Sequence, residues 1–124
     1  MIQQQTIVKI LDNSGAKNVK CIQCIAGKRF SRLGDSIVVT VKELRTKSRR
    51  TSKVLKGEVH TAIITTTKSA FRRKDGSILY SGNNSAVLIG ISGKTIGTRV
   101  LGPLPRILRN VKQLKLASMS IGFL

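Results

Sequence analysis

Aromatic side chains and long apolar runs are both scarce in this sequence. It has one tyrosine, three phenylalanines and no tryptophan, which argues against the single-strand binders that stack bases on aromatic platforms. No run of about eighteen apolar residues and no basic amphipathic helix is present, so we expect no membrane partner. The opening letters MIQQQTIVKI contain no leader pattern, and only two cysteines occur. We therefore expect the protein to work in a reducing compartment, and in the one where it is made.

The shortage of acidic residues says most about function. Five Asp and Glu residues face twenty-three Lys and Arg residues, which leaves a formal net charge of +18. Self-repulsion of that size is tolerable mainly when a polyanion compensates it, and the usual polyanion is nucleic acid. Because aromatic residues are few, phosphate contacts and shape should dominate its recognition.

The strand pattern predicts one small all-β domain over residues 1–124. A chain of this length is too short for two separate cores, and its 40% hydrophobic content is that of a globular protein. Apolar and β-branched runs, separated by turns rich in Gly, Asp and Asn, predict strands at residues 6–11, 18–26, 36–41, 58–66 and 84–91. Five or six strands with little helix predict a closed β-barrel, because closure removes free strand edges.

Three further segments are predicted outside those strands. The pair Asp75-Gly76 within residues 71–80 indicates a hairpin that reaches outward, with a basic first limb. Residues 111–119 suggest a short C-terminal helix. Residues 42–56 hold seven basic residues and one acidic residue without the apolar stripe of a packed helix, so we expect an arm or long loop there. This arm is either a solvated face or an insertion along a phosphate backbone.

Residues 97–110, GTRVLGPLPRILRN, must turn. Gly97 and Gly102 allow backbone conformations closed to other residues, and two prolines fix φ and remove backbone donors. Arg99, Arg106 and Arg109 add fork-shaped cations suited to phosphate. The stretch is either a solvated turn that carries arginines or a shaped surface that meets an anion.

Candidate catalytic and metal motifs fail on spacing. Cys21 and Cys24 lie three apart on a predicted strand and should point to opposite faces, so we interpret them as two small core residues. The segment Gly93-Lys94-Thr95 lacks the earlier glycine and the long helix of a phosphate-binding P-loop. We therefore expect no metal site and no cofactor.

The remaining titratable residues also have structural interpretations. His60 lies within a predicted strand and has no nucleophile or second ligand near it in sequence. Asp12, Asp35 and Asp75 each lie in a predicted turn with a glycine close by, where aspartates cap the backbone. We predict that the protein is not an enzyme and has no catalytic residues.

An ordered set of motifs over nearly the whole chain carries a family resemblance. They are Met1 to Gln3, DNSGA at residues 12–16, Cys21-Ile22, Gly34-Asp35 with Ile37, Lys42-Glu43, Lys56-Gly57, Arg72-Arg73, Asp75 to Ser77, Asn84, Ala86 to Leu88 and IGTRVLGPLPRILR from Ile96. Each is weak alone, but their order and spacing are specific. The sequence resembles the bacterial-type ribosomal large-subunit protein numbered fourteen.

The resemblance implies a five-stranded β-barrel with a projecting β-hairpin and short C-terminal helices. It also implies a structural role in the large ribosomal subunit, where family members bind large-subunit rRNA near the subunit interface. Implied partners are small-subunit rRNA at an intersubunit bridge, the neighbouring ribosomal proteins numbered three and nineteen, and a ribosome silencing factor.

The departures from the family pattern concern lineage and local register. Ile107 stands where the family usually has glutamate, Leu101 replaces a common phenylalanine, and Tyr80 lies one place early, which leaves the local strand register open. Residues 45–52 lack the usual Pro-Gly turn and are richer in arginine. These changes favour a divergent organelle-encoded protein of the mitochondrial matrix, before a plastid or bacterial cytoplasmic one.

Two functional hypotheses follow, and each depends on the basic segments. The first is a ribosomal RNA-binding structural protein, and the alternative is a free basic β-barrel of an organelle nucleoid or regulatory complex. For rRNA binding we predict Lys28, Arg29, Arg32, Arg45, Lys47, Arg49, Arg50, Arg72, Arg73 and Lys74. For the intersubunit or factor face we predict Thr98, Arg99, Arg106, Arg109 and Lys112.

Overall fold

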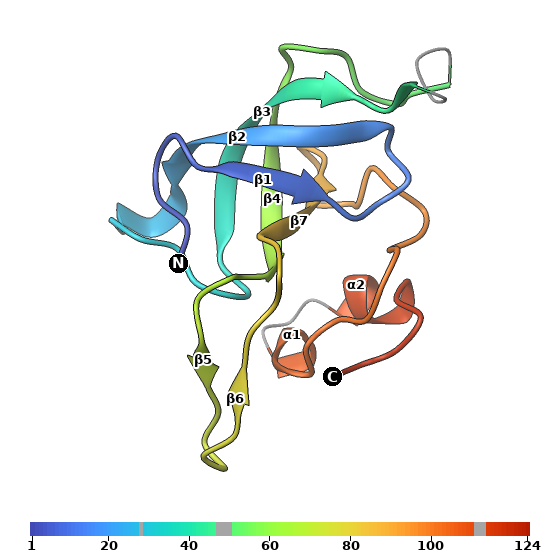
Figure 1. The fold of residues 1–124 in the computed structure, drawn as a ribbon. Helices are drawn as coiled ribbons and strands as arrows, with labels where there is room; N and C mark the ends of the chain where they lie inside the picture. The colour runs from blue at the N-terminus through green and yellow to red at the C-terminus, as the bar shows by residue number, and fades with distance from the viewer. Residues whose placement is uncertain (28, 47–50, 111–113) are drawn as a thin grey trace.

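The computed structural model of the protein describes residues 1–27, 29–46, 51–110 and 114–124. Five strands form a closed barrel in the order β1-β2-β3-β4-β7 (Figure 1). They are β1 (Ile7–Ile10), β2 (Ala16–Cys24), β3 (Ser36–Leu44), β4 (Val59–Thr66) and β7 (Ser85–Ile89). The prediction of a mainly β fold with a closed five-stranded barrel is confirmed.

Closure depends on one parallel pairing between the first and last strands. β1 pairs with β7 through Lys9↔Ser85 and Ile10↔Ala86, while the other neighbours pair antiparallel. The Lys9 N–H donates to the Asn84 carbonyl at 3.0 Å, and the Leu11 N–H donates to the Ala86 carbonyl at 3.1 Å. Because each barrel strand has two neighbours, the barrel presents no long free edge to another chain.

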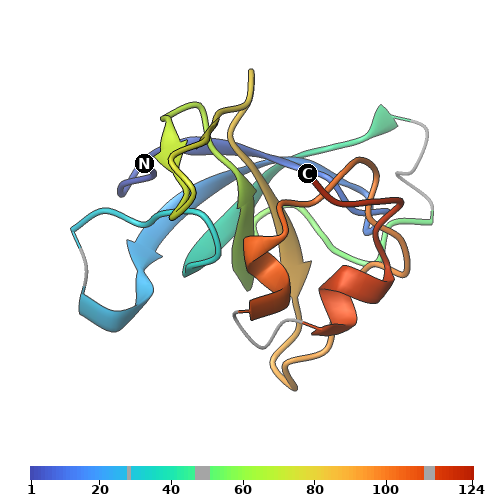
Figure 2. The same cartoon turned by 90° about the horizontal axis from the view of Figure 1, so that it is seen from below.

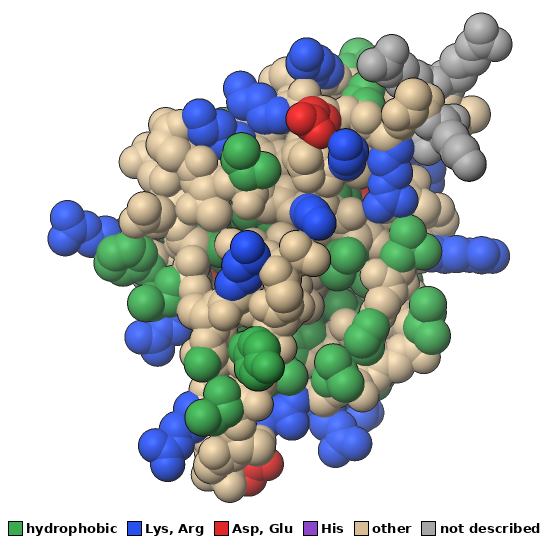
Figure 3. Space-filling view, viewed as in Figure 1, with side chains coloured by type: hydrophobic (Ala, Val, Ile, Leu, Met, Phe, Trp, Pro, Cys, Tyr) green, Lys and Arg blue, Asp and Glu red, His purple; other side chains and the backbone are tan. Residues whose placement is uncertain are grey.

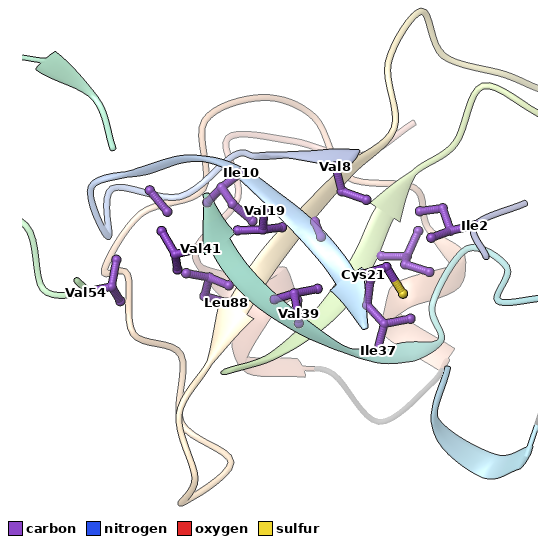
Figure 4. Close-up of a cluster of buried hydrophobic side chains, with 14 of the residues drawn as sticks. Ile2, Val8, Ile10, Val19, Cys21, Ile37, Val39, Val41, Val54 and Leu88 are labelled. Atoms are coloured by element: carbon purple, nitrogen blue, oxygen red, sulfur yellow. The ribbon is translucent and has the colours of Figure 1, made fainter. Parts of the chain in front are cut away.

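The inside of the barrel is filled by alternate residues of the strands (Figure 4). Ile37, Val39 and Val41 of β3 are fully buried, and the residues between them are half-buried. β1 alternates in the same way, with Val8 and Ile10 buried between exposed Ile7 and Lys9. This period of two is the pattern from which the strands were predicted.

The two cysteines correct one prediction. A register shift between Cys21 and Gln23 adds a residue to β2, so Cys21 pairs with Val39 and Cys24 with Ile37, two positions along β3. Both cysteines therefore lie in the same inner core cluster rather than on opposite faces. The alternation argument was wrong because a β-bulge breaks the period of two. Their interpretation as core residues is confirmed, since both are buried.

A second core covers the outside of β4 and β7. Ile63, Val87 and Ile89 point outward and pack with residues from the last quarter of the chain, namely Val100, Leu104, Leu108 and Leu116. Two short helices, α1 (Ile107–Asn110) and α2 (Leu114–Ser118), supply part of that layer; they lie below the barrel in Figure 1 and in front of it in Figure 2. Strands β4 and β7 are thus buried on both faces, which explains their nearly continuous apolar runs.

The predicted hairpin is present and projects from the barrel (Figure 1). β5 (Phe71–Arg72) pairs with β6 (Ile78–Leu79) in the register Phe71↔Leu79 and Arg72↔Ile78. That register settles the alignment left open near Tyr80. Gly76 has a φ of 85°, which the tight turn after Asp75 requires.

The described parts of the predicted arm at residues 42–56 are attached to the barrel. β3 continues to Leu44, and the segment that returns to the barrel is fixed by the Lys53 N–H, which donates to the Ser14 carbonyl at 2.9 Å. Val54 is 1% exposed and belongs to the inner core cluster. The few apolar residues of this basic segment were enough to anchor it.

Candidate nucleic-acid interface

The basic loop at residues 27–35 is held in shape by the barrel and by the N-terminal segment. Ile2 and Ser31 exchange two backbone hydrogen bonds of 2.8 and 2.7 Å, and the Gly34 N–H donates to the Ile64 carbonyl at 2.9 Å. An oxygen of Asp35 accepts from the Arg32 N–H at 2.8 Å, which is the predicted capping role of this aspartate. Arg29 and Arg32 are exposed on this fixed loop, while Lys28 lies outside the described residues.

Arg45 fastens two turns of the barrel together. Its N–H donates to the Gly15 carbonyl at 2.9 Å, and its Nη2 donates to the Ile10 carbonyl at 3.0 Å. The side chain is half-buried, so part of its fork serves the protein itself. The other residues predicted here, Lys47, Arg49 and Arg50, lie outside the described residues.

The hairpin carries its basic residues near the tip. An oxygen of Asp75 accepts from the Ser77 hydroxyl at 2.7 Å and from the Ser77 N–H at 3.0 Å. The Ser77 hydroxyl, followed by the backbone N–H, lowers the pKa of the Asp75 carboxyl. Arg72 and Lys74 are exposed, whereas Arg73 is half-buried and its Nη2 donates to the Leu124 oxygen at 2.7 Å. Arg73 thereby ties the hairpin to the C-terminal segment.

The glycine-rich stretch after β7 is anchored by Asn13. Its Oδ1 accepts from the Thr98 N–H at 2.7 Å and from the Arg99 N–H at 3.2 Å, and its Nδ2 donates to the Thr98 hydroxyl at 2.8 Å. The Thr98 and Arg99 side chains remain exposed. Asn13 was not among the predicted site residues, although its place in the DNSGA turn marked it as a residue that bonds to backbone.

Gly97 was expected to provide backbone freedom, and the structure gives a different reason for this glycine. Gly102 has a φ of 116°, as expected for a residue in a conformation that favours glycine, but Gly97 is not in that region. A Cβ at Gly97 would lie 2.7 Å from the Asp12 Cβ and 3.0 Å from the Asn13 Oδ1. Gly97 is therefore required by close approach to the turn at residues 12–15 rather than by backbone freedom.

The arginines around α1 lie on the C-terminal layer. Arg106 and Arg109 are exposed, and the Arg106 N–H donates to the Leu124 oxygen at 3.0 Å. The Arg109 guanidinium lies 5.4 Å from the centre of the Phe123 ring, within cation–π range. Thr98 and Arg99 are thus held by Asn13, whereas Arg106 and Arg109 contact the C-terminal residues Leu124 and Phe123. Lys112 lies outside the described residues.

Each acidic residue is used within the protein. Asp12 is fully buried, its Oδ1 accepts from the Ser14 N–H at 2.9 Å and from the Ser14 hydroxyl, and its Oδ2 accepts from the Leu88 N–H at 3.0 Å. Glu43 accepts from the Asn18 amide at 2.9 Å and lies 3.5 Å from the Lys17 ammonium. Hydrogen bonds from the Leu55 N–H and then from His60 lower the pKa of the Glu58 carboxyl. Asp35 and Asp75 cap their loops in the same manner.

The surface carries an excess of positive charge because acidic residues are few. Five carboxylates cannot neutralise twenty-three Lys and Arg residues, whatever their geometry. Figure 3 shows Lys and Arg side chains over the barrel, the loops and the hairpin, with acidic side chains at few places on this face. The surface is therefore positive in several regions and complementary to an extended anion.

An apolar groove interrupts this positive surface. It lies between the base of the hairpin and the C-terminal layer and encloses about 240 Å³. Its lining includes exposed Tyr80, Leu101 and Leu124, together with Pro103 and Pro105. Hydrophobic side chains gather over this region in Figure 3. The lining residues include neutral polar side chains but no Lys or Arg, so an apolar ligand suits this surface better than phosphate does.

Neither a metal-binding cluster nor a membrane-spanning helix is present among the described residues. No group of three or more His, Cys, Asp or Glu residues among them could hold a metal ion. His60 is half-buried and 3.1 Å from a Glu58 oxygen, in the strand position expected for it. No helix in this part of the chain is long and apolar enough to cross a bilayer.

Fold and surface together define a small, strongly basic, closed β-barrel protein. The sequence model of one family, ribosomal protein L14p/L23e, matches residues 1–124, which is the whole chain. The chain belongs to that family. It is accordingly a structural, non-enzymatic protein of the large ribosomal subunit, and the resemblance drawn from its motifs is confirmed.

Proposed function

We propose that the protein holds large-subunit rRNA in place by neutralising its phosphates with basic segments mounted on a rigid barrel. The observation that supports this most is the net charge of +18 on a chain whose five carboxylates are all used internally. The described contact residues would be Arg29, Arg32, Arg45, Arg72, Arg73 and Lys74, and Lys28, Lys47, Arg49 and Arg50 are added from sequence alone.

Salt dependence tests this proposal directly. If about seven phosphates are contacted, affinity for large-subunit rRNA should fall by about three to five decades between about 50 and 200 mM salt. The measurement is a titration of labelled rRNA fragments at several salt concentrations. A flat response would contradict the proposal. Sedimentation tests the alternative, because a free nucleoid or regulatory protein would not travel with the large subunit at low salt.

We further propose that Thr98, Arg99, Arg106, Arg109 and Lys112 face the small subunit and contribute to an intersubunit bridge with its rRNA. The anchoring of Thr98 and Arg99 by Asn13 supports this, because an exposed residue on a fixed backbone loses little entropy when it binds. The same face would receive a ribosome silencing factor where one exists.

The apolar groove is suited to contact with a neighbouring ribosomal protein. Ribosomal proteins numbered three and nineteen are the expected neighbours, and exposed Tyr80, Leu101 and Leu124 are contacts suited to a protein rather than to phosphate. Replacement of Leu101 by glutamate should weaken copurification of such a neighbour while rRNA binding persists.

We place the protein in a mitochondrial ribosome before a plastid or bacterial one. Two features support this assignment. The segment at residues 45–52 is rich in arginine and lacks the family's Pro-Gly turn, and the net charge of the chain is high. Fractionation of the source cells into organelles and cytosol, followed by detection of this chain, decides among the compartments.

A further inference from the structure

Three segments far apart in the sequence meet around Met1. Ile2 is paired with Ser31 of the basic loop, and the Met1 amino group donates to the Ser69 hydroxyl next to β5. Figure 1 shows the N-terminal segment beside the basic loop and above the hairpin. The N-terminal segment therefore brings the loop at residues 27–35 close to the start of the hairpin.

Two adjoining hollows lie at this junction. One encloses about 300 Å³ and is lined by Arg32, Phe71 and Arg72, among others. The second encloses about 390 Å³ and is lined by Arg29, Phe30, Arg32 and Asp35. Met1 and Arg32 line both, so the hollows share a wall. We name the pair the N-terminal cleft, defined by Met1, Arg29, Phe30, Arg32, Phe71 and Arg72.

The side chains of the cleft combine cations with aromatic rings. Arg29, Arg32 and Arg72 are exposed, Phe30 is 44% exposed and Phe71 is half-buried. Two of the three phenylalanines of the chain are therefore next to arginines at one junction. The low aromatic content argued against base stacking, but the fold concentrates the few rings that exist. Arginine forks suit phosphate, and ring faces suit a base.

Asp35 supplies the one carboxylate beside the cleft among the described residues, and its position separates the two roles. Asp35 lines only the hollow that contains Phe30, and one of its oxygens accepts from the Arg32 N–H. A phosphate there would face a like charge. The hollow between Arg32 and Arg72 has no carboxylate among its lining residues and is the better phosphate position.

We propose that the N-terminal cleft binds one unstacked nucleotide of RNA, with its phosphate between Arg32 and Arg72 and its base against Phe30 or Phe71. The inference rests on the proposed rRNA-binding function and names the substrate that this part of it takes. A nucleotide inside a regular duplex cannot enter, because its base is stacked and paired. The cleft thus selects a bulged or looped nucleotide rather than a helix.

Two RNA hairpins test the proposal, one with a fully paired stem and one with a single unpaired nucleotide in the same stem. Wild-type protein should bind the bulged hairpin about tenfold more tightly, as expected for one base stacked on an aromatic ring. The double variant Phe30→Leu/Phe71→Leu keeps apolar volume but removes both rings, and it should bind the two hairpins equally. Fluorescence anisotropy of labelled RNA gives both affinities, and circular dichroism checks that the variant is folded.

Matched variants separate this idea from the general binding function. Tyr80→Leu removes an exposed ring that lines neither hollow of the cleft, so it should keep the preference for the bulge. Arg72→Gln should reduce the preference, whereas Lys94→Gln should not, because Lys94 is exposed and lines neither hollow. Equal, salt-sensitive binding of both hairpins by wild type would overturn the cleft proposal alone. If wild type bound neither hairpin, or if its binding did not weaken with salt, the rRNA-binding proposal itself would be overturned.

Discussion

Asp12 is a buried carboxylate that joins two distant parts of the barrel. One oxygen caps its own turn at Ser14, and the other accepts from the Leu88 N–H near the end of β7. Its Cβ also marks the place where Gly97 must approach without a side chain. Asp12 thus shapes the turn at residues 12–15, binds the backbone of β7 and contacts the stretch that begins at Gly97.

Replacing Asp12 by alanine should destabilise the fold. The Leu88 N–H would be buried without a partner, which costs about 1–3 kcal/mol of the free energy of unfolding. Asp75→Ala is the matched control, because Asp75 makes the same two bonds to Ser77 but lies on the exposed hairpin. Urea unfolding of the two variants measures the difference. Equal losses would show that the bond to β7 contributes nothing.

Cys21 makes stability depend on pH at the alkaline end. Burial, followed by the neighbouring Cys24, raises the pKa of its thiol from 9.0 to about 11. A raised pKa means that the folded state holds the proton more tightly than the unfolded state does. The stabilisation is therefore complete below about pH 9 and is lost as pH rises toward about 11.

The expected loss is on the order of 1–3 kcal/mol across that range. Urea unfolding of wild type and of Cys21→Ala, at about pH 8 and about pH 10.5, measures it. The alanine variant is less stable overall but should show a smaller drop between the two pH values, because it lacks the thiol whose pKa burial raises. A drop of the same size in both would place the pH dependence elsewhere.

At the scale of elements, residues 97–110 depend on the turn that follows β1. Asn13 binds the backbone of Thr98 and Arg99, and the Leu101 N–H donates to the Leu11 carbonyl at 2.7 Å. Val100, Leu104 and Leu108 of the same stretch are buried against β4 and β7. The stretch is therefore a fastened layer of the protein with an exposed basic edge, and not a loose loop.

Asn13→Ala should loosen this edge without unfolding the barrel. The Thr98 and Arg99 amides lose their acceptor, so their hydrogen exchange should accelerate by about fivefold, the equivalent of about 1 kcal/mol for one hydrogen bond. Asn18→Ala serves as control, because Asn18 bonds to Glu43 on another part of the barrel. Unchanged exchange at residues 98 and 99 would mean that other contacts hold the stretch.

At the scale of the whole molecule, folding and the proposed binding use mostly different charges, and Arg45 and Arg73 serve both. The carboxylates stabilise turns and strands from within, while the excess of Lys and Arg repels itself and is relieved when an anion binds. Variants of exposed arginines should therefore affect assembly more than folding. The opposite holds for variants of Asp12 or Asn13.

The double variant Arg99→Ala/Arg106→Ala should weaken joining of the two ribosomal subunits by about tenfold or more, since contacts to charged groups contribute about 1.5–3 kcal/mol each. Its melting temperature should change little, because both side chains are exposed. The control Lys68→Ala/Lys94→Ala removes the same charge outside the predicted face. Sucrose-gradient analysis of reassociated subunits measures joining. Equal effects on joining and on melting would make the stretch a structural element only.

The strands and the hairpin could be predicted from residue order, because alternation and the Asp-Gly turn are local properties. Net charge is additive over the chain, and the polyanion partner that it predicts stays a prediction. The bounds of the arm predicted at residues 42–56 were wrong because packing outweighs composition there. Buried Val54 anchors this segment to the barrel, although its basic residues suggested an arm. The Cys21–Cys24 geometry was missed because a bulge depends on the partner strand. The structural roles of Arg45 and Arg73 were missed because their acceptors lie 35 and 51 residues away.

The sequence alone determined that this is a basic β-barrel of a recognisable ribosomal family, since hydrophobic period, turn residues and ordered motifs survive without coordinates. Only the tertiary structure decided which side chains meet. It placed Asn13 under Thr98 and Arg99, brought Asp12 to β7 and gathered Phe30, Phe71 and three arginines around Met1. The physical reason is that closure of a barrel joins residues by strand register and not by sequence distance, so contacts of this kind have no local signature.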